Sequence, residues 1–209
     1  MAAMSVLEKL ASALGRRDEA PNVALATALA ASGDTAAIEE LVEGLSARDK
    51  NIQSDCIKVL YEIGERKAGL IAPFKEIFAG LLGSKNNRLA WGAMTALDAI
   101  AGVDPQGIHP YLPAIVDAAD AGSVITRDHA VGILIKLYAV DVYADDCFAL
   151  LSEQLSKCPV NQLPMYAEMA LPAIRPQHKA QFAATLQSRL SEIEKASKRT
   201  RVEKVIRKI

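Results

Sequence analysis

The chain has 209 residues and a formal net charge of -1 at pH 7, so its overall charge gives no reason to expect nucleic acid or an anionic membrane as a partner. Hydrophobic residues make up 51% of the chain and aromatic residues only 5%, because alanine and leucine carry most of the apolar content. Alanine and leucine favour helices, whereas strands are enriched in β-branched and aromatic residues, so the composition favours an all-helical fold.

The first predicted element is a short helix that begins after Ser5 and ends near Leu14. Ser5-Val6-Leu7-Glu8 has the spacing of a capping box, in which the serine and glutamate side chains accept hydrogen bonds from free backbone N–H groups. A pair of helices is expected next, at about 22–31 and 35–47, with a turn at Ser32-Gly33-Asp34. This pair is shorter than the later units, as is typical of a terminal unit whose outer face meets water.

Beyond this pair, apolar residues recur every 37 residues. One column of the repeat holds Leu60, Leu97, Leu134 and Leu171. Four neighbouring columns keep the same register: Ile63, Ile100, Leu137 and Ile174; Val59, Ala96, Ile133 and Ala170; Cys56, Ala93, Ala130 and Ala167; and Ile52, Leu89, Thr126 and Leu163. Only Thr126 interrupts the apolar pattern, and the offsets are those of the buried stripe of a helix. The third of these columns holds only small residues, which lets a neighbouring helix approach closely.

A second helix is expected in each unit, at about 72–82, 109–119, 143–157 and 177–196. Pro73 and Pro110 share a column near the start of this helix, where proline is tolerated because its missing N–H would have no helical partner. A basic segment follows, and Thr200-Arg201-Val202-Glu203 predicts another capping box at its helix. Its apolar stripe consists of Val202, Val205, Ile206 and Ile209.

The paired helices, the leucine-rich and small-residue columns and the 37-residue period resemble HEAT repeats, and armadillo repeats are similar. The resemblance implies an all-α fold of the α-α superhelix class, a right-handed solenoid of about five HEAT-like helix pairs in one domain over residues 1–209. The expected divisions are an N-terminal cap helix at 1–19, repeats at 20–48, 49–85, 86–122, 123–159 and 160–196, and a basic C-terminal helix at 197–209. It also implies a concave binding surface lined by the second helices.

The sequence offers no recognisable catalytic, cofactor or metal site. Cys56, Cys147 and Cys158 lack paired spacing and are expected to be small buried residues, and His109, His129 and His178 lie far apart. Glycine-rich phosphate-binding motifs are absent, and the acidic pairs are expected on solvated faces or at helix starts. Trp91, the only tryptophan, lies beside the buried stripe, which favours a packing role. We therefore expect that the chain is not an enzyme and binds no cofactor or metal.

The expected function is that of a non-catalytic scaffold or adaptor that binds another protein, because a solenoid offers a long surface but few convergent pockets. Candidate contact residues, chosen from their placement on second helices and turns, are Lys75, Lys85, Arg88, Tyr111 and Asp117. The alternative is nucleic-acid binding through Lys85, Arg88 and the basic tail, which could instead cap the last unit, dock an acidic partner or touch a membrane surface. No apolar run approaches the roughly 20 residues of a membrane span, and no signal peptide is recognisable, so a cytoplasmic location is expected.

Overall fold

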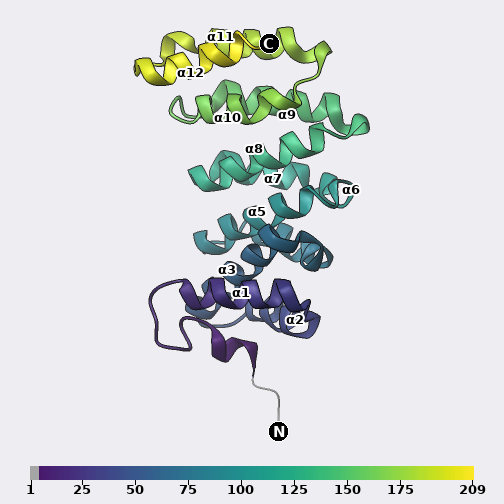
Figure 1. Cartoon of the computed structure of the whole chain (residues 1–209), viewed down its shortest axis with the longest axis vertical. Helices are drawn as coiled ribbons and strands as arrows, with labels where there is room; N and C mark the ends of the chain where they lie inside the picture. Colours follow the sequence, from purple (N-terminus) through teal and green to yellow (C-terminus); the bar gives the residue numbers. More distant parts are fainter. Residues whose placement is uncertain (1–4) are drawn as a thin grey trace. The chain divides into compact units, whose positions relative to one another are not determined.

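The computed structural model describes residues 5–209, and these residues form α-helices and short 3-10 helices without any strand. The chain divides into two compact units, one that ends at Ala130 and one that runs from Val131 to Ile209. Figure 1 colours the chain along its sequence and labels most of its helices. Helix α8, Val124–Tyr138, contributes residues to both units.

The first unit begins with a 3-10 helix, η1, at Val6–Lys9. Its remaining elements, in chain order, are α1 (Ala20–Ser32), α2 (Thr35–Gly44), α3 (Lys50–Lys67), η2 (Ala68–Leu70), η3 (Ala72–Phe74), α4 (Lys75–Leu81), α5 (Asn87–Ala101), α6 (Pro105–Ile108), η4 (His109–Tyr111) and α7 (Leu112–Ala121). Helix α3 packs against α1, α2 and α5, and α5 also packs against α4. The predicted second helices at 72–82 and 109–119 are present, each opened by a 3-10 turn that contains its proline.

The 37-residue period is visible in the helix starts, because α3, α5 and α8 begin at Lys50, Asn87 and Val124. The five sequence columns are buried throughout except at Ile52 and Leu171, which are partly exposed. The exception at Leu171 has a local cause. Helix α10 ends one residue earlier, and Leu171 belongs to the 3-10 turn η6 that follows.

Polar side chains cap the starts of these helices, and glycines allow a helix end and a close contact between two helices. Asp49 and Asn86 accept hydrogen bonds from backbone N–H groups in the first turns of α3 and α5, which satisfies donors that the helix leaves unpaired. Gly33 ends α1 with a φ of 70°, a left-handed conformation that other residues rarely adopt. Gly92 of α5 allows close approach to α3, since a Cβ there would lie 2.6 Å from Cγ1 of Ile57.

The second unit contains the later part of α8, η5 (Asp141–Tyr143), α9 (Ala144–Lys157), α10 (Leu163–Ala170), η6 (Leu171–Ala173), η7 (Pro176–His178), α11 (Lys179–Ser188), η8 (Leu190–Glu192) and α12 (Ala196–Ile206). The basic helix α12 packs against α10 and α11. Of its predicted apolar stripe, Val202 and Val205 are buried, whereas Ile206 and Ile209 are partly exposed.

Three predicted local features are wrong. The helix expected up to Leu14 is only the short η1, and the helix expected at 177–196 ends at Ser188, where the Arg189 side chain folds back to the carbonyl oxygens of Leu155 and Cys158. The predicted capping box at Thr200 is also wrong, because α12 already begins at Ala196 and Thr200 lies inside it.

Among residues 5–209, no helix combines the length and the hydropathy needed to cross a bilayer.

Candidate functional site

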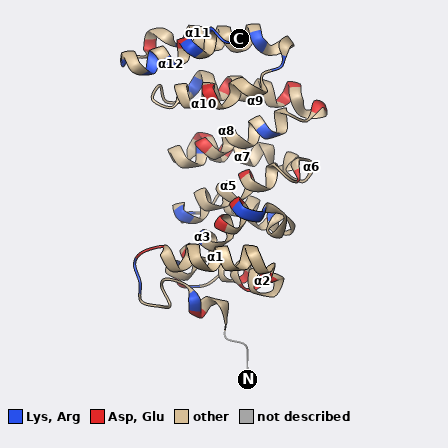
Figure 2. Cartoon of the chain, in the orientation of Figure 1, with Lys and Arg blue, Asp and Glu red and all other residues tan. Residues whose placement is uncertain are grey.

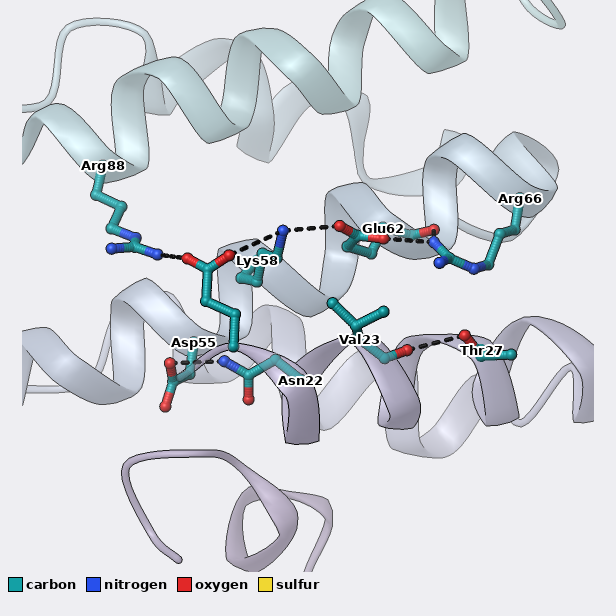
Figure 3. Close-up of polar contacts among 9 residues, drawn as sticks. Asn22, Val23, Thr27, Asp55, Lys58, Glu62, Arg66 and Arg88 are labelled. Atoms are coloured by element: carbon teal, nitrogen blue, oxygen red, sulfur yellow. Dashed lines mark hydrogen bonds and ion pairs between the residues drawn. The ribbon is translucent and has the colours of Figure 1, made fainter. Parts of the chain in front are cut away.

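A row of charged side chains links α1, α3 and α5 in the first unit (Figure 3). We call Arg88, Glu19, Lys58, Glu62 and Arg66, in this order, the charged row. The Lys58 Nζ atom lies 3.1 Å from Oε2 of Glu19 and 2.7 Å from Oε1 of Glu62. Arg66 pairs with the other Glu62 oxygen at 2.5 Å, and Arg88 pairs with Glu19. Positive and negative groups therefore alternate along the row.

The local sequence explains how the row forms. Lys58, Glu62 and Arg66 follow one another at four-residue spacing on α3, which places their side chains on one face of the helix. Glu19 directly precedes α1, and Arg88 lies in the first turn of α5. Because α3 packs against both α1 and α5, these two residues reach the α3 side chains from the neighbouring helices.

Lys58 and Glu62, at the centre of the row, favour their charged forms although both side chains are largely shielded from water. Burial alone would lower the pKa of Lys58, but the neighbouring Glu62, Tyr61 and Glu19 raise it above its ordinary value. Burial would likewise raise the pKa of Glu62, but hydrogen bonds from Lys58 and Arg66 hold it below its ordinary value. Lys58 and Glu62 therefore each stabilise the charged form of the other.

Two aromatic rings lie beside the charged row. The rings of Tyr61 on α3 and Trp91 on α5 are 5.5 Å apart between centroids. Lys58 lies 4.8 Å from the centroid of the Tyr61 ring, and the Arg88 guanidinium lies 6.0 Å from that of Trp91. Cations at these distances are attracted by the electron-rich ring faces. Trp91 is partly exposed, so it combines the predicted packing role with a surface that a partner can contact.

A hollow of about 450 Å³ adjoins the row and shares Glu19 and Arg88 with it. We call it the polar hollow; its lining also includes Ser12, Arg17, Asn51 and Asp55. The fully buried Asn22 holds two residues of this lining in place, because it donates to Oδ1 of Asp55 at 2.7 Å and accepts from the Ala11 N–H at 2.9 Å. The other Asp55 oxygen accepts from the Ser12 N–H at 2.7 Å, so the segment before α1 is held against α3.

The predicted contact residues lie in different places in the first unit. Of the five, only Arg88 belongs to the charged row. Lys75, at the start of α4, pairs with Asp104 at 3.0 Å. Partial burial and the neighbouring Glu76 carboxylate raise the pKa of Tyr111, which ends η4. Lys85, in the turn before α5, and Asp117, on α7, are both exposed.

Sequence reasoning missed most of the charged row. The four-residue spacing of Lys58, Glu62 and Arg66 is a readable signal for charge pairing on one helix. Glu19 has no such signal, because it lies before the first helix and outside the repeat. The pairing of Tyr61 with Trp91 is also not readable from the sequence, since the two rings come from successive units.

Cysteine and histidine side chains are held in packed surroundings. All three cysteines are buried, as predicted. Burial raises the pKa of the Cys56 thiol to about 12 and that of the Cys147 thiol to about 11, so little reactive thiolate forms at neutral pH. Nδ1 of His129 lies 2.8 Å from Asp98, and the His178 ring stacks on Phe148 with centroids 4.0 Å apart. Among the described residues, no group of three or more His, Cys, Asp and Glu side chains is placed to hold a metal ion.

The cations of the basic tail make contacts within the second unit. Arg201 of α12 forms two hydrogen bonds to the Glu168 carboxylate, at 2.8 and 2.5 Å. Lys198 donates to the Asn161 side chain at 2.7 Å, and Arg199 donates to the Ile193 carbonyl oxygen. Figure 2 shows charges of both signs scattered over the helices, with lysine and arginine on α12. Through these contacts and its buried valines, α12 is held against neighbouring elements of the second unit.

No protein-family model matches the chain, and no curated protein matches it either. Several solved structures, in contrast, match the fold of this chain. A designed armadillo repeat protein in complex with the peptide (KR)4 is 14% identical, with a TM-score of 0.63 over 88% of this chain and 84% of that one. Computationally designed armadillo repeat proteins for modular peptide recognition are 15% identical, with a TM-score of 0.62 over 97% of each chain. An engineered protein is 21% identical, with a TM-score of 0.58 over 98% of each chain. The predicted helical-repeat architecture is confirmed, and the chain has the armadillo/HEAT-like α-α solenoid fold.

Proposed function

We propose that the chain is a non-catalytic scaffold that binds another protein, and that the partner contacts the charged row and Trp91 in the first unit. The observation that carries this proposal is the meeting of Arg88, Tyr61 and Trp91 on neighbouring helices. Tryptophan, tyrosine and arginine are enriched among the residues that dominate binding energy at protein interfaces. Of the designed armadillo repeat proteins with this fold, one is in complex with a peptide and others are designed for modular peptide recognition, which supports a polypeptide as the partner.

The charge pattern also favours a protein over a nucleic acid. The row alternates three cations with two carboxylates, which suits a partner that presents polar groups of both signs. A nucleic-acid partner would require cations directed at phosphates, but Arg88 pairs with Glu19 and Arg201 pairs with Glu168. Nucleic-acid binding through Lys85, Arg88 and the basic tail remains the alternative, and it predicts affinity that rises steeply as salt is lowered.

The predicted contact residues on the second helices are the other candidate for the partner. Lys75, Tyr111 and Asp117 lie on α4, η4 and α7, and Lys85 lies in the turn before α5. These are the second helices on which the repeat resemblance places binding. The two candidates use different helices, so substitutions can separate them.

The test compares capture of partners from lysate of the source cells by three immobilised proteins. These are the wild type, Trp91→Ala with Arg88→Ala, and Lys75→Ala with Tyr111→Ala and Asp117→Ala. We expect the Trp91→Ala, Arg88→Ala double variant to capture at least tenfold less of a specific partner than the wild type does. The triple variant should capture as much of it as the wild type. Thermal unfolding of each protein controls for loss of the fold. Retention by the double variant and loss by the triple variant would move the site to the second helices.

Two further outcomes would refute the proposal more broadly. If no partner is retained above the level of an unrelated bead-bound protein, the scaffold function is wrong. If the captured material is nuclease-sensitive and its binding strengthens steeply at low salt, the nucleic-acid alternative replaces it.

A further inference from the structure

The end of the basic helix α12 carries exposed cations that have no acidic partner in the described part of the chain. Residues 195–209 contain seven lysine and arginine residues and a single acid. Lys204 lies in the last turn of α12, and Arg207 and Lys208 follow within the next turn. All three side chains are exposed, and none forms a salt bridge within residues 5–209. They form a positive face that is open to solvent.

The carboxylate of α10 that lies within the influence of Lys208 is already paired. Glu168 accepts two hydrogen bonds from Arg201, and this contact is the main reason that its pKa is lowered. The charge of Lys208 adds only a smaller effect to the same carboxylate. The second unit therefore leaves its exposed cations largely uncompensated.

Helix α2 of the first unit presents the opposite charge. Residues 20–47, which include α1 and α2, contain four acids and no lysine or arginine. Two of the acids, Asp34 and Glu40, already accept hydrogen bonds from backbone N–H groups. The other two, Glu39 and Glu43, are exposed and form no salt bridge within the described range.

Both faces place like charges about one helical turn apart. Glu39 and Glu43 are four residues apart on α2, and Lys204 and Lys208 have the same spacing at the end of α12. Like charges at this spacing repel each other and destabilise a helix. Glu43 also lies in the last turn of α2, where the helix dipole disfavours a carboxylate. An opposite pair of charges at the same spacing would relieve the repulsion on both faces.

We infer that the face of α12 that carries Lys204, Arg207 and Lys208 docks helix α2 of a second copy of this chain. The matched spacing allows Glu39 and Glu43 of one copy to lie opposite these cations of the other. Two different surfaces meet in this contact, so it is heterologous, and each copy retains one free surface of each kind for further copies. The inference goes beyond the proposed scaffold function and does not depend on it.

The exposed side of α2 is suited to the close approach of another helix. Thr35 and Ala36 precede Glu39 by four and three residues, so these small exposed side chains lie on the same side of α2 as the carboxylate. Small residues let a second helix pack closely. Because α2 exposes carboxylates and small side chains but no large apolar group, the attraction between copies is chiefly electrostatic. Salt screens such an attraction between exposed charges.

The test measures the mass of the full chain by sedimentation equilibrium over a hundredfold range of protein concentration. The measurements are made at about 50 mM and at about 500 mM NaCl, which differ in how strongly they screen exposed charges. At the lower salt we expect the average mass to rise above that of the monomer as the concentration increases. The association constant should fall at least tenfold at the higher salt. The dependence on concentration separates association between copies from a contact within one copy.

Two charge reversals locate the contact. The first variant is Glu39→Lys with Glu43→Lys, and the second is Lys204→Glu with Lys208→Glu. Each variant alone should associate at least tenfold more weakly than the wild type, because its α2 and α12 faces then carry the same charge. An equimolar mixture should regain association, since the first variant keeps its basic α12 and the second keeps its acidic α2.

The matched control is Lys67→Glu with Lys85→Glu, which changes the net charge as much as the α12 variant does. Both lysines are exposed in the first unit and lie outside the two proposed faces. This variant should change the association constant less than twofold. Thermal unfolding checks that every variant keeps the fold.

Several results would overturn the inference. These are a wild type that stays monomeric over the whole range at low salt, association that is insensitive to salt, equal weakening by the control, and a mixture of the two reversals that associates no better than either alone. None of these measurements contains another protein, so their failure would leave the scaffold function untouched.

Discussion

Replacing Leu97 by alanine tests the central packing claim, namely that the 37-residue register identifies the core. The Leu97 side chain on α5 is fully buried, and its helix packs against α3 and α4. Removing three carbon atoms from such a position leaves a cavity that neighbours fill only in part. The expected loss is about 2–5 kcal/mol of unfolding free energy, as for other large core truncations.

The register also supplies an internal control. Leu171 occupies the same sequence column but is partly exposed, because α10 ends just before it. Leu171→Ala therefore removes less apolar surface from the interior, and we expect a loss of about 1–2 kcal/mol. The difference between the two variants comes from tertiary structure, since the sequence pattern treats the two leucines alike.

Urea unfolding followed by circular dichroism at 222 nm measures both losses of unfolding free energy. Each loss appears as a shift in the midpoint urea concentration, while the dependence of the free energy on urea concentration stays unchanged. The melting temperature gives a second reading, and each kcal/mol corresponds to about 2–4 °C for a chain of this size. A loss below about 1 kcal/mol for Leu97→Ala, or a larger loss for Leu171→Ala, would show that the packing described for α5 is incorrect.

Three further predictions concern buried polar groups and thiols. The pKa of Glu62 is lowered in the folded chain from its ordinary 4.5, so its stabilising contribution is complete above that pH and is lost as the pH falls through the folded value. Glu62→Gln should therefore show a smaller acid-induced drop in melting temperature than the wild type, and equal drops would contradict this. Cys56, with its pKa raised to about 12, should react with a thiol reagent at pH 8 at least a hundredfold more slowly in the native chain than in urea; equal rates would exclude the described burial. Asn22→Ala should lower the free energy of unfolding by about 1–3 kcal/mol and speed hydrogen exchange at the Ala11 amide, which loses its acceptor; unchanged protection of this amide would contradict the hydrogen bond from Ala11 to Asn22.

The helical repeat and most of its core can be read from the amino-acid sequence alone. Periodic burial leaves a direct trace in the sequence, because each helix must place apolar residues at fixed offsets to cover its neighbour. The starts of α3, α5 and α8 follow the 37-residue step, and the small column from Cys56 to Ala167 is buried at every position. Even the polar Thr126 of this pattern is accommodated, since its hydroxyl meets that of Ser123 at 3.0 Å.

Helix ends were less predictable, because several interactions compete at each boundary. The spacing of Thr200 and Glu203 matches a capping box, but α12 begins four residues earlier. The helix after His178 ends at Ser188, where Arg189 bonds to backbone carbonyls of α9 and the turn after it. Such contacts depend on segments about 30 residues away, so a local pattern carries no record of them.

The charged row and the polar hollow, in contrast, arise from the packing of helices that are distant in the sequence. Glu19, Lys58 and Arg88 are up to 69 residues apart, and they meet because α1, α3 and α5 pack side by side. Hydrophobic periodicity constrains which face of a helix is buried, but it leaves the polar side chains free to vary. Which of those side chains then pair, and which donors remain without an acceptor, depends on distances that exist only after the helices have packed.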